Sequence, residues 1–293
     1  MDGTHAPRAA LAGIFWMIMA CLLSAMAAGL VRHLAGSVPT MELVFFRNLA
    51  GLAVVVPVLA HRGGFSGLGT TRLPMHCVRV AFQYLAMVLL FYALANMPIA
   101  DAFALQFTIP LFTILAAVAF LGQSAGKGSW IACFVGFAGA LAVVRPGFAT
   151  VTLAAGAALA SSVMSAGSNT SIKLLSRTDG PALITVYSNL IMLPLALVPS
   201  LFVWVTPAWA EVPAIAGMAV LHALGGYCFT RSVAAADARV VQPFQFARML
   251  FAAAIGFVLF RELPDAWTWT GALIIFAAAY YVARRETGRR NAT

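Results

Sequence analysis

Arg248 stands inside the apolar run 239–262, which is long enough to cross a bilayer. It lies about nine residues into that run, or about 13 Å at 1.5 Å per residue. Charges at such depth are rare, face a bundle interior or a water-filled cavity, and mark ligand or ion paths. A guanidinium there is suited to clamp a substrate carboxylate through two parallel hydrogen bonds. The alternative is a structural ion pair or bonds to backbone carbonyls.

Glutamines accompany Arg248 on the same helical face. Gln245 and Gln242 precede it at intervals of three residues, a spacing at which helical side chains are neighbours. Gln106, in the first half of the chain, is matched to Gln245 by the internal repeat described below. These side chains fit either a polar cavity or interhelical hydrogen bonds, which polar residues also form in bilayers.

Two further pairs of polar residues are candidates for lining the same cavity. His222 corresponds to Gln83 in the internal repeat, and both lie at membrane depth. Ser165 and Asn169 lie one helical turn apart on a segment rich in small and hydroxyl residues. Such a segment fits either a moving gate or close static packing of helices.

Two tyrosines, Tyr84 and Tyr227, lie about halfway along their apolar segments. A ring facing the cavity is able to stack on an aromatic or apolar substrate side chain. Most aromatic residues of such a chain serve instead as core or interface anchors. The tyrosines are therefore candidates for substrate binding on position alone.

The composition limits where the chain can fold. Hydrophobic residues make up 62% of its 293 residues and charged residues only 9%, against about 25% in soluble domains. We therefore predict an all-α integral membrane protein with the lipid bilayer as its solvent. The net charge of +9 is spread between apolar runs and forms no basic patch, which argues against nucleic-acid binding. The cysteines and histidines show no metal-ligand spacing, so we expect no metal and no cofactor.

Ten spans are predicted when the chain is divided at charges, Pro and Gly. The first span has an alternative interpretation as a cleaved signal peptide, but its apolar run continues past the small-residue site Ala25-Met26-Ala27. The connections are short and leave no room for a soluble domain. The spans are 10–31, 40–60, 76–95, 100–121, 127–144, 151–173, 181–200, 212–231, 239–260 and 265–283.

The basic residues predict the orientation of these spans. Thirteen Lys and Arg residues fall in the termini and loops of one side, and only Arg32, Arg145 and Arg261 fall on the other. The side rich in basic residues is cytoplasmic. The sequence therefore predicts a multi-pass inner-membrane protein with both termini in the cytoplasm.

The two halves of the chain repeat each other. At an offset of 139, Gln106 matches Gln245, Phe107 matches Phe246 and Trp130 matches Trp269; toward the N-terminus the offset is 141, as for the pair Asn48 and Asn189. We therefore predict two five-helix repeats, residues 1–147 and 148–293, around a central cavity. Because five is odd, the second repeat is inverted, and inverted repeats are typical of transporters that work by alternating access.

Sequence patterns over nearly the whole chain are typical of a known family. They are FFRNLAGL (45–52), 91–123 and 128–147, with the counterparts 230–241 and 259–278. In these segments the chain resembles the drug/metabolite transporter superfamily, in its ten-span EamA-type branch. The resemblance implies export or exchange of small metabolites, often amino acids, with a cavity lined by spans 1, 3, 4, 6, 8 and 9. Arg248 and Met249 depart from the first repeat, which has Ile109 and Pro110 there.

The acidic residues separate the possible mechanisms. All nine lie in termini, in loops or close to span ends, whereas proton-driven carriers embed a carboxylate in the membrane. Glu42, the acid nearest to Arg248, begins its span and is better placed to pair with Arg47. We therefore predict facilitated transport or exchange with weak or no proton coupling.

The expected cargo is a small carboxylate-bearing metabolite, most of all an amino acid, with aromatic and apolar amino acids included. A sugar phosphate or a nucleotide-sugar is the alternative cargo, although dianions of that kind favour more than one cavity cation. A polar-lined channel is the alternative mechanism. No catalytic motif is present, so the chain is not expected to be an enzyme. A stripe of small residues at 128, 132, 136 and 140 fits packing within the chain or against a second protomer, which leaves a homodimer open.

Overall fold

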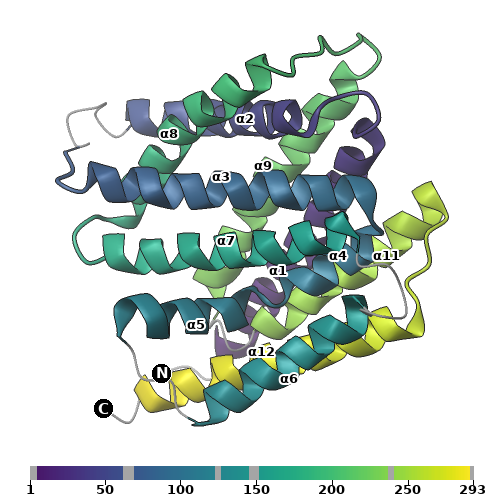
Figure 1. Cartoon of the computed structure of the whole chain (residues 1–293). Helices are drawn as coiled ribbons and strands as arrows, with labels where there is room; N and C mark the ends of the chain where they lie inside the picture. Colours follow the sequence, from purple (N-terminus) through teal and green to yellow (C-terminus); the bar gives the residue numbers. More distant parts are fainter. Residues whose placement is uncertain (1–4, 62–68, 123–126, 145–151, 237–240, 291–293) are drawn as a thin grey trace.

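The computed structural model describes residues 5–61, 69–122, 127–144, 152–236 and 241–290, which form helices and the turns between them (Figure 1). Five of these helices are long and apolar enough to cross a membrane. The predicted all-helical class is confirmed, and each predicted span corresponds to one helix or to two consecutive ones. The elements are α1 (His5–Leu34), α2 (Thr40–His61), α3 (Leu73–Asn96), α4 (Ile99–Gln106), α5 (Ile109–Leu121), α6 (Lys127–Val144), α7 (Leu153–Leu175), α8 (Pro181–Leu201), α9 (Val212–Ala235), the 3₁₀ helix η2 (Gln242–Phe246), α11 (Ala247–Phe260) and α12 (Ala266–Arg290).

Successive spans run in opposite directions, so their connections gather at two ends of the bundle (Figure 1). We call one the α3–α4 end; it also holds the end of α1 and the end of α11. We call the other the α7–α8 end; it also holds the start of α1 and the end of α12. The predicted boundary between the repeats, at residues 147 and 148, lies outside the described residues.

The helix contacts follow the predicted repeat. α1 packs along α9 and α3 packs along α7, and exchanging the two repeats converts the first pair into the second. α2 packs on α8 and α6 on α12, so each of these helices contacts its own repeat partner. Two inverted five-helix units therefore enclose a common interior, as predicted.

The fourth and ninth spans are broken at equivalent places. α4 ends at Gln106 and α5 begins at Ile109, while η2 gives way to α11 at Ala247. The repeat partners Phe107 and Phe246 stack on each other, with ring centroids 5.7 Å apart and planes 20° apart. The two breaks therefore meet at the junction between the halves.

Left-handed residues end these two spans at equivalent positions as well. α5 is capped by Gly122 with φ 61° and α11 by Arg261 with φ 58°. A left-handed conformation costs a non-glycine residue about 1–2 kcal/mol. In the second repeat this turn is closed by the backbone N–H of Glu262, which donates to the carbonyl of Gly256 at 3.0 Å. The turn fixes where the Glu262 side chain begins.

The backbones of α6 and α12 come into direct contact at two glycines, Gly139 and Gly271. A Cβ added at Gly139 would lie 2.8 Å from the carbonyl oxygen of Gly271, and one added at Gly271 would lie 2.5 Å from that of Gly139. Small residues permit such close approach of helices in membranes. This crossing joins the last helix of one repeat to the last helix of the other.

We expect Gly271→Ala to destabilise the protein by about 1–3 kcal/mol, because the methyl group must push two backbones apart. Gly156→Ala is the matched control, since a Cβ at this exposed helical glycine meets no atom within 4 Å and alanine has the higher helix propensity. Thermal unfolding in detergent measures both variants. Equal melting temperatures for the two would contradict the close crossing.

Candidate functional site

A cavity of about 310 Å³ lies between helices of the two repeats. This volume is at the small end of the range for ligand pockets, roughly 300–1,000 Å³. It extends from Ile172, in the last turn of α7, to Phe91, in the second-last turn of α3. Its polar lining residues come from α2, α3, α7 and α9: Arg47, Arg79, Gln83, Ser161, Ser165, Ser168, Asn169 and His222.

Arg47 reaches the cavity from α2 and contacts only neutral groups there. Its guanidinium donates to the sulfur of Met87 on α3 and to Nε2 of His222 on α9. Since arginine has no acceptor, Nε2 must accept this bond, and the imidazole is the neutral tautomer with its proton on Nδ1. Nε of Arg47 is buried without a hydrogen-bond partner. A permanent cation thus faces the cavity with donor capacity to spare.

Arg79 is the second cation in the cavity wall. It lies in the second turn of α3 and is only 8% exposed. Its guanidinium donates to the hydroxyl of Ser188 and, at 3.5 Å, to the carbonyl of Ile184, both on α8. Nε of Arg79 is buried without a partner. Neutral groups therefore hold this guanidinium in place as well.

No carboxylate neutralises these arginines among the described residues that line the cavity. The expected pairing of Glu42 with Arg47 is not formed. Oε1 of Glu42 instead accepts the backbone N–H of Val205 at 2.6 Å, because Glu42 lies in the first turn of α2, close to the α8–α9 loop. The cavity wall is cationic.

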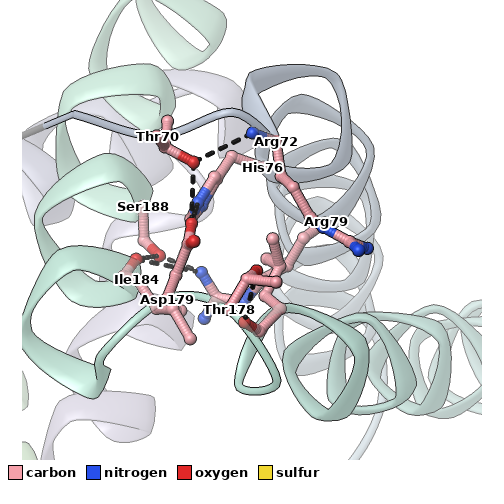
Figure 2. Close-up of polar contacts among 9 residues, drawn as sticks. Thr70, Arg72, His76, Arg79, Thr178, Asp179, Ile184 and Ser188 are labelled. Carbon is pink, nitrogen blue, oxygen red and sulfur yellow. Dashed lines mark hydrogen bonds and ion pairs between the residues drawn. The ribbon is translucent and has the colours of Figure 1, made fainter.

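A polar network fastens α3 to the α7–α8 turn beside the cavity (Figure 2). The hydroxyl of Thr70 and Nε2 of buried His76 both donate to Oδ2 of Asp179, at 2.8 and 2.7 Å. These two hydrogen bonds, the His76 bond first, hold the pKa of Asp179 below its ordinary value. His76 precedes Arg79 by one turn on the same helix. The network therefore positions the segment that carries Arg79.

An ion pair joins the two repeats at the opposite, α3–α4 end. Arg32, at the end of α1, pairs with Glu262 of the second repeat and also donates to the carbonyls of Leu94 and Met97, at 3.1 and 2.6 Å. Glu262 in turn accepts the backbone N–H of Ile99 at 3.4 Å. These bonds satisfy carbonyls at the end of α3 and an amide at the start of α4, where helices leave backbone groups unpaired.

Four of the residues predicted to bind substrate lie together in this cavity. Gln83, Ser165, Asn169 and His222 all line it. Oε1 of Gln83 is buried without a hydrogen-bond partner, so a ligand donor is able to satisfy it. Within the described part of the chain, no group of three or more His, Cys, Asp or Glu is arranged to hold a metal ion.

Arg248 was predicted to clamp a substrate carboxylate. It lies beside the cavity and is not among the residues that line it. Its guanidinium carbon lies 5.5 Å from the ring centroid of Phe103, and its Nε is buried without a partner. It is close to Cys21 and near enough to His222 for its charge to act on the imidazole. Arg248 therefore adds positive charge near His222 without lining the cavity.

Four other predicted residues, whose side chains the structure describes, are not among those that line the cavity: Gln106, Tyr84, Tyr227 and Gln245. Gln106 donates to Ser161 at 3.2 Å, an interhelical bond from α4 to α7. Tyr84 is buried with its hydroxyl unpartnered, and Tyr227 is 55% exposed with its ring against Trp16. Gln245 is partly buried and has a polar partner, whereas the side chain of Gln242 lies outside the described residues.

The sequence interpretation missed the two arginines that line the cavity. Arg79 was counted among the thirteen basic residues of the inner side because it was predicted to lie only three residues into its span, whereas α3 begins at Leu73. Arg47 was recognised inside a span but assigned to Glu42. The cavity also uses the second span, through Arg47. Among the residues that the structure describes, none of those lining the cavity comes from spans 1, 4 or 9. Six residues of helix precede Arg79 in α3, and they place it about two turns from the helix start.

A comparison with protein families decides the kind of protein. The EamA-like transporter family matches the chain twice, over residues 11–145 and 152–284. The chain belongs to the EamA-like transporter family. The resemblance to the drug/metabolite transporter superfamily is thereby confirmed, and this EamA-like protein is a membrane transporter of small metabolites and not an enzyme.

The relatives of this EamA-like transporter carry different cargoes by name. A riboflavin transporter of Vibrio cholerae is 28% identical over 281 residues, covering 94% of each chain. A pseudopaline exporter of Pseudomonas aeruginosa is 29% identical and covers 94% of this chain and 97% of its own. An S-adenosylmethionine uptake transporter of Rickettsia prowazekii is 24% identical, covering 94% and 93%. These names agree on transport and differ in substrate and direction.

A solved crystal structure supports the fold. It superposes with a TM-score of 0.61 at 18% identity and covers 96% of this chain and 99% of its own. At this identity the likeness concerns the arrangement of helices alone.

We expect the single variants Arg32→Gln and Glu262→Gln to lower stability by about 1–3 kcal/mol each, because a charge-assisted bond is lost and a partly buried partner remains. The reversed pair, Arg32→Glu with Glu262→Arg, should not restore stability, since a carboxylate cannot donate to the carbonyls of Leu94 and Met97. Thermal unfolding measures all three. Full recovery in the reversed pair would show that those carbonyl bonds are dispensable.

The lowered pKa of Asp179 gives a pH dependence. Its folded pKa lies below the unfolded value of about 3.9, so its stabilising effect is present above that pH and is lost as the pH falls through the folded pKa. We expect Asp179→Asn to melt at a lower temperature than the unaltered protein at pH 7, and the difference to shrink below about pH 4. A difference that stays constant from pH 7 to pH 3 would contradict this role.

Proposed function

We propose that this transporter carries small carboxylate-bearing metabolites, amino acids among them, through the cavity between its repeats. Arg47 supports this most directly. It is a permanent cation deep in a membrane bundle, held by neutral partners, open to a cavity and left with an unpartnered Nε. An unpaired charge at such depth is costly, and a bound carboxylate would supply the missing counter-charge through a bidentate contact.

Alternating access is the proposed mechanism. The cavity reaches the last turn of α7, while at the α3–α4 end the pair of Arg32 and Glu262 ties the repeats together. Rocking of the two units, residues 1–147 against 148–293, would break this tie and expose the cavity at that end. We further propose that the α7–α8 end faces the cytoplasm of a cell with this protein in its inner membrane, because most Lys and Arg outside the spans fall there.

Arg248 has a supporting role in this proposal. Its guanidinium lies over the ring of Phe103 beside the cavity and adds positive charge near the site where Arg47 contacts the imidazole of His222. Since no described lining residue is a carboxylate able to bind a proton, the mechanism is facilitated transport or exchange.

Counterflow in reconstituted vesicles, with a panel of amino acids and other carboxylates, tests the proposal. We expect saturable uptake that is stimulated by substrate on the far side, which a channel would not show. Arg47→Gln should reduce this uptake at least tenfold, and Arg248→Gln should reduce it less. Arg177→Gln, an exposed arginine in the α7–α8 turn, is the matched control and should leave uptake unchanged. Unimpaired counterflow in Arg47→Gln would refute the proposed site.

A further inference from the structure

We infer that the cavity selects substrates with two separate anionic groups joined by a short spacer, one group held by Arg47 and the other by Arg79. This inference rests on the proposed function, because it takes the cavity as the transport site. It narrows the cargo from carboxylates in general to the class of short dicarboxylates.

Both arginines are presented to the same cavity with capacity to bind. Each donates to neutral protein groups only: Arg47 to Met87 and His222, and Arg79 to Ser188 and the carbonyl of Ile184. Each has a buried Nε with no partner. The two guanidiniums are therefore oriented by the fold and are not neutralised by it.

Asp179, the carboxylate beside this part of α3, is already hydrogen-bonded to other residues. Asp179 accepts two hydrogen bonds at Oδ2, from Thr70 and from His76 one turn before Arg79. It is not among the residues lining the cavity, and no acidic residue is found in the described lining. Compensation of two positive charges is thus left to the ligand.

The size of the cavity limits the length of that ligand. Arg79, Gln83 and Met87 lie on one face of α3 at intervals of four residues, and Arg47 is anchored on Met87. The cavity that both arginines line has a volume of about 310 Å³, which is at the small end of the range for ligand pockets. A short spacer, such as the two methylene groups of succinate, keeps both carboxylates within this cavity.

We expect the number of negative charges on the ligand to decide how tightly it binds in this cavity. A monoanion satisfies one guanidinium and leaves the other without a counter-charge in a site of low dielectric, where an unpaired charge is strongly unfavourable. A charge-assisted hydrogen bond contributes enough to change affinity about 10- to 100-fold. A phosphate monoester carries both charges on one group, so it tests whether the two anionic groups must be separate.

Binding of succinate and of succinamate to the purified full-length protein at pH 7.5 tests the inference. The two ligands have nearly the same shape and differ by one charge. We expect succinate to bind at least tenfold more tightly in calorimetry, with glycerol 3-phosphate weaker than succinate. In Arg79→Gln the preference should fall below about threefold, whereas Arg177→Gln should keep it. The comparison of ligands in the unaltered protein stands by itself if Arg79→Gln does not fold.

Equal affinity for succinate and succinamate, tighter binding of glycerol 3-phosphate, or no binding of any of the three would overturn the inference. If the preference for succinate is absent while Arg47-dependent counterflow persists, the two-anion selection fails and the proposed function stands. If the preference is found but no carboxylate shows counterflow, the anion site stands and the proposed transport function fails.

Discussion

A cation buried in a membrane bundle needs water, a counter-charge or a ligand, and this requirement shapes the interior of the protein. The cost of an arginine at the bilayer centre is about 2.5–3.5 kcal/mol on insertion scales and about 10–17 kcal/mol for an isolated helix. Arg47 and Arg79 are held by a thioether, an imidazole, a hydroxyl and a carbonyl, none of which carries a charge. The water, counter-charge or ligand that these two cations still need is therefore to be found in the cavity that both of them line.

Cations with and without a counter-charge lie in different parts of the bundle. Arg32 is paired at the α3–α4 end, whereas Arg47 and Arg79 line the cavity with no carboxylate partner among the residues that the structure describes. Arg32 has its carboxylate in Glu262, and the left-handed turn at Arg261 places that carboxylate against α4. The equivalent positions in the other repeat are Lys173 and Gln123, a combination that cannot form an ion pair. Two inverted repeats share a backbone fold but not their side chains. An ion pair such as that of Arg32 and Glu262 is therefore able to join the repeats at one end of the bundle without an equivalent pair at the other.

The fold followed from the sequence because its determinants are local or periodic. Ten apolar stretches and the matches at Gln106 and Gln245 were sufficient to predict two inverted units, and the stacking of Phe107 on Phe246 places those units face to face. The site followed only in part, because which helix face meets the cavity depends on packing between distant segments. Gln83 and His222 were found through the repeat. Arg79 was missed because it was counted among the inner-side basic residues, whereas the earlier start of α3 at Leu73 places it two turns into the helix. The clamp predicted for Arg248 is the role that we propose for Arg47.

Membership of the family accounts for the fold of this protein but does not identify its substrate. Relatives named for riboflavin, pseudopaline and S-adenosylmethionine share nearly the whole length of this chain, although their names differ in substrate. In this chain two arginines line the cavity, and we propose that they select the cargo.

Crystals grown with 2-bromosuccinate would locate the substrate by the anomalous signal of bromine. We predict a bromine peak inside the cavity, with one carboxylate on Arg47 and the other on Arg79. A peak outside the cavity, with water alone between the two guanidiniums, would contradict the claim that these unpaired cations bind the cargo.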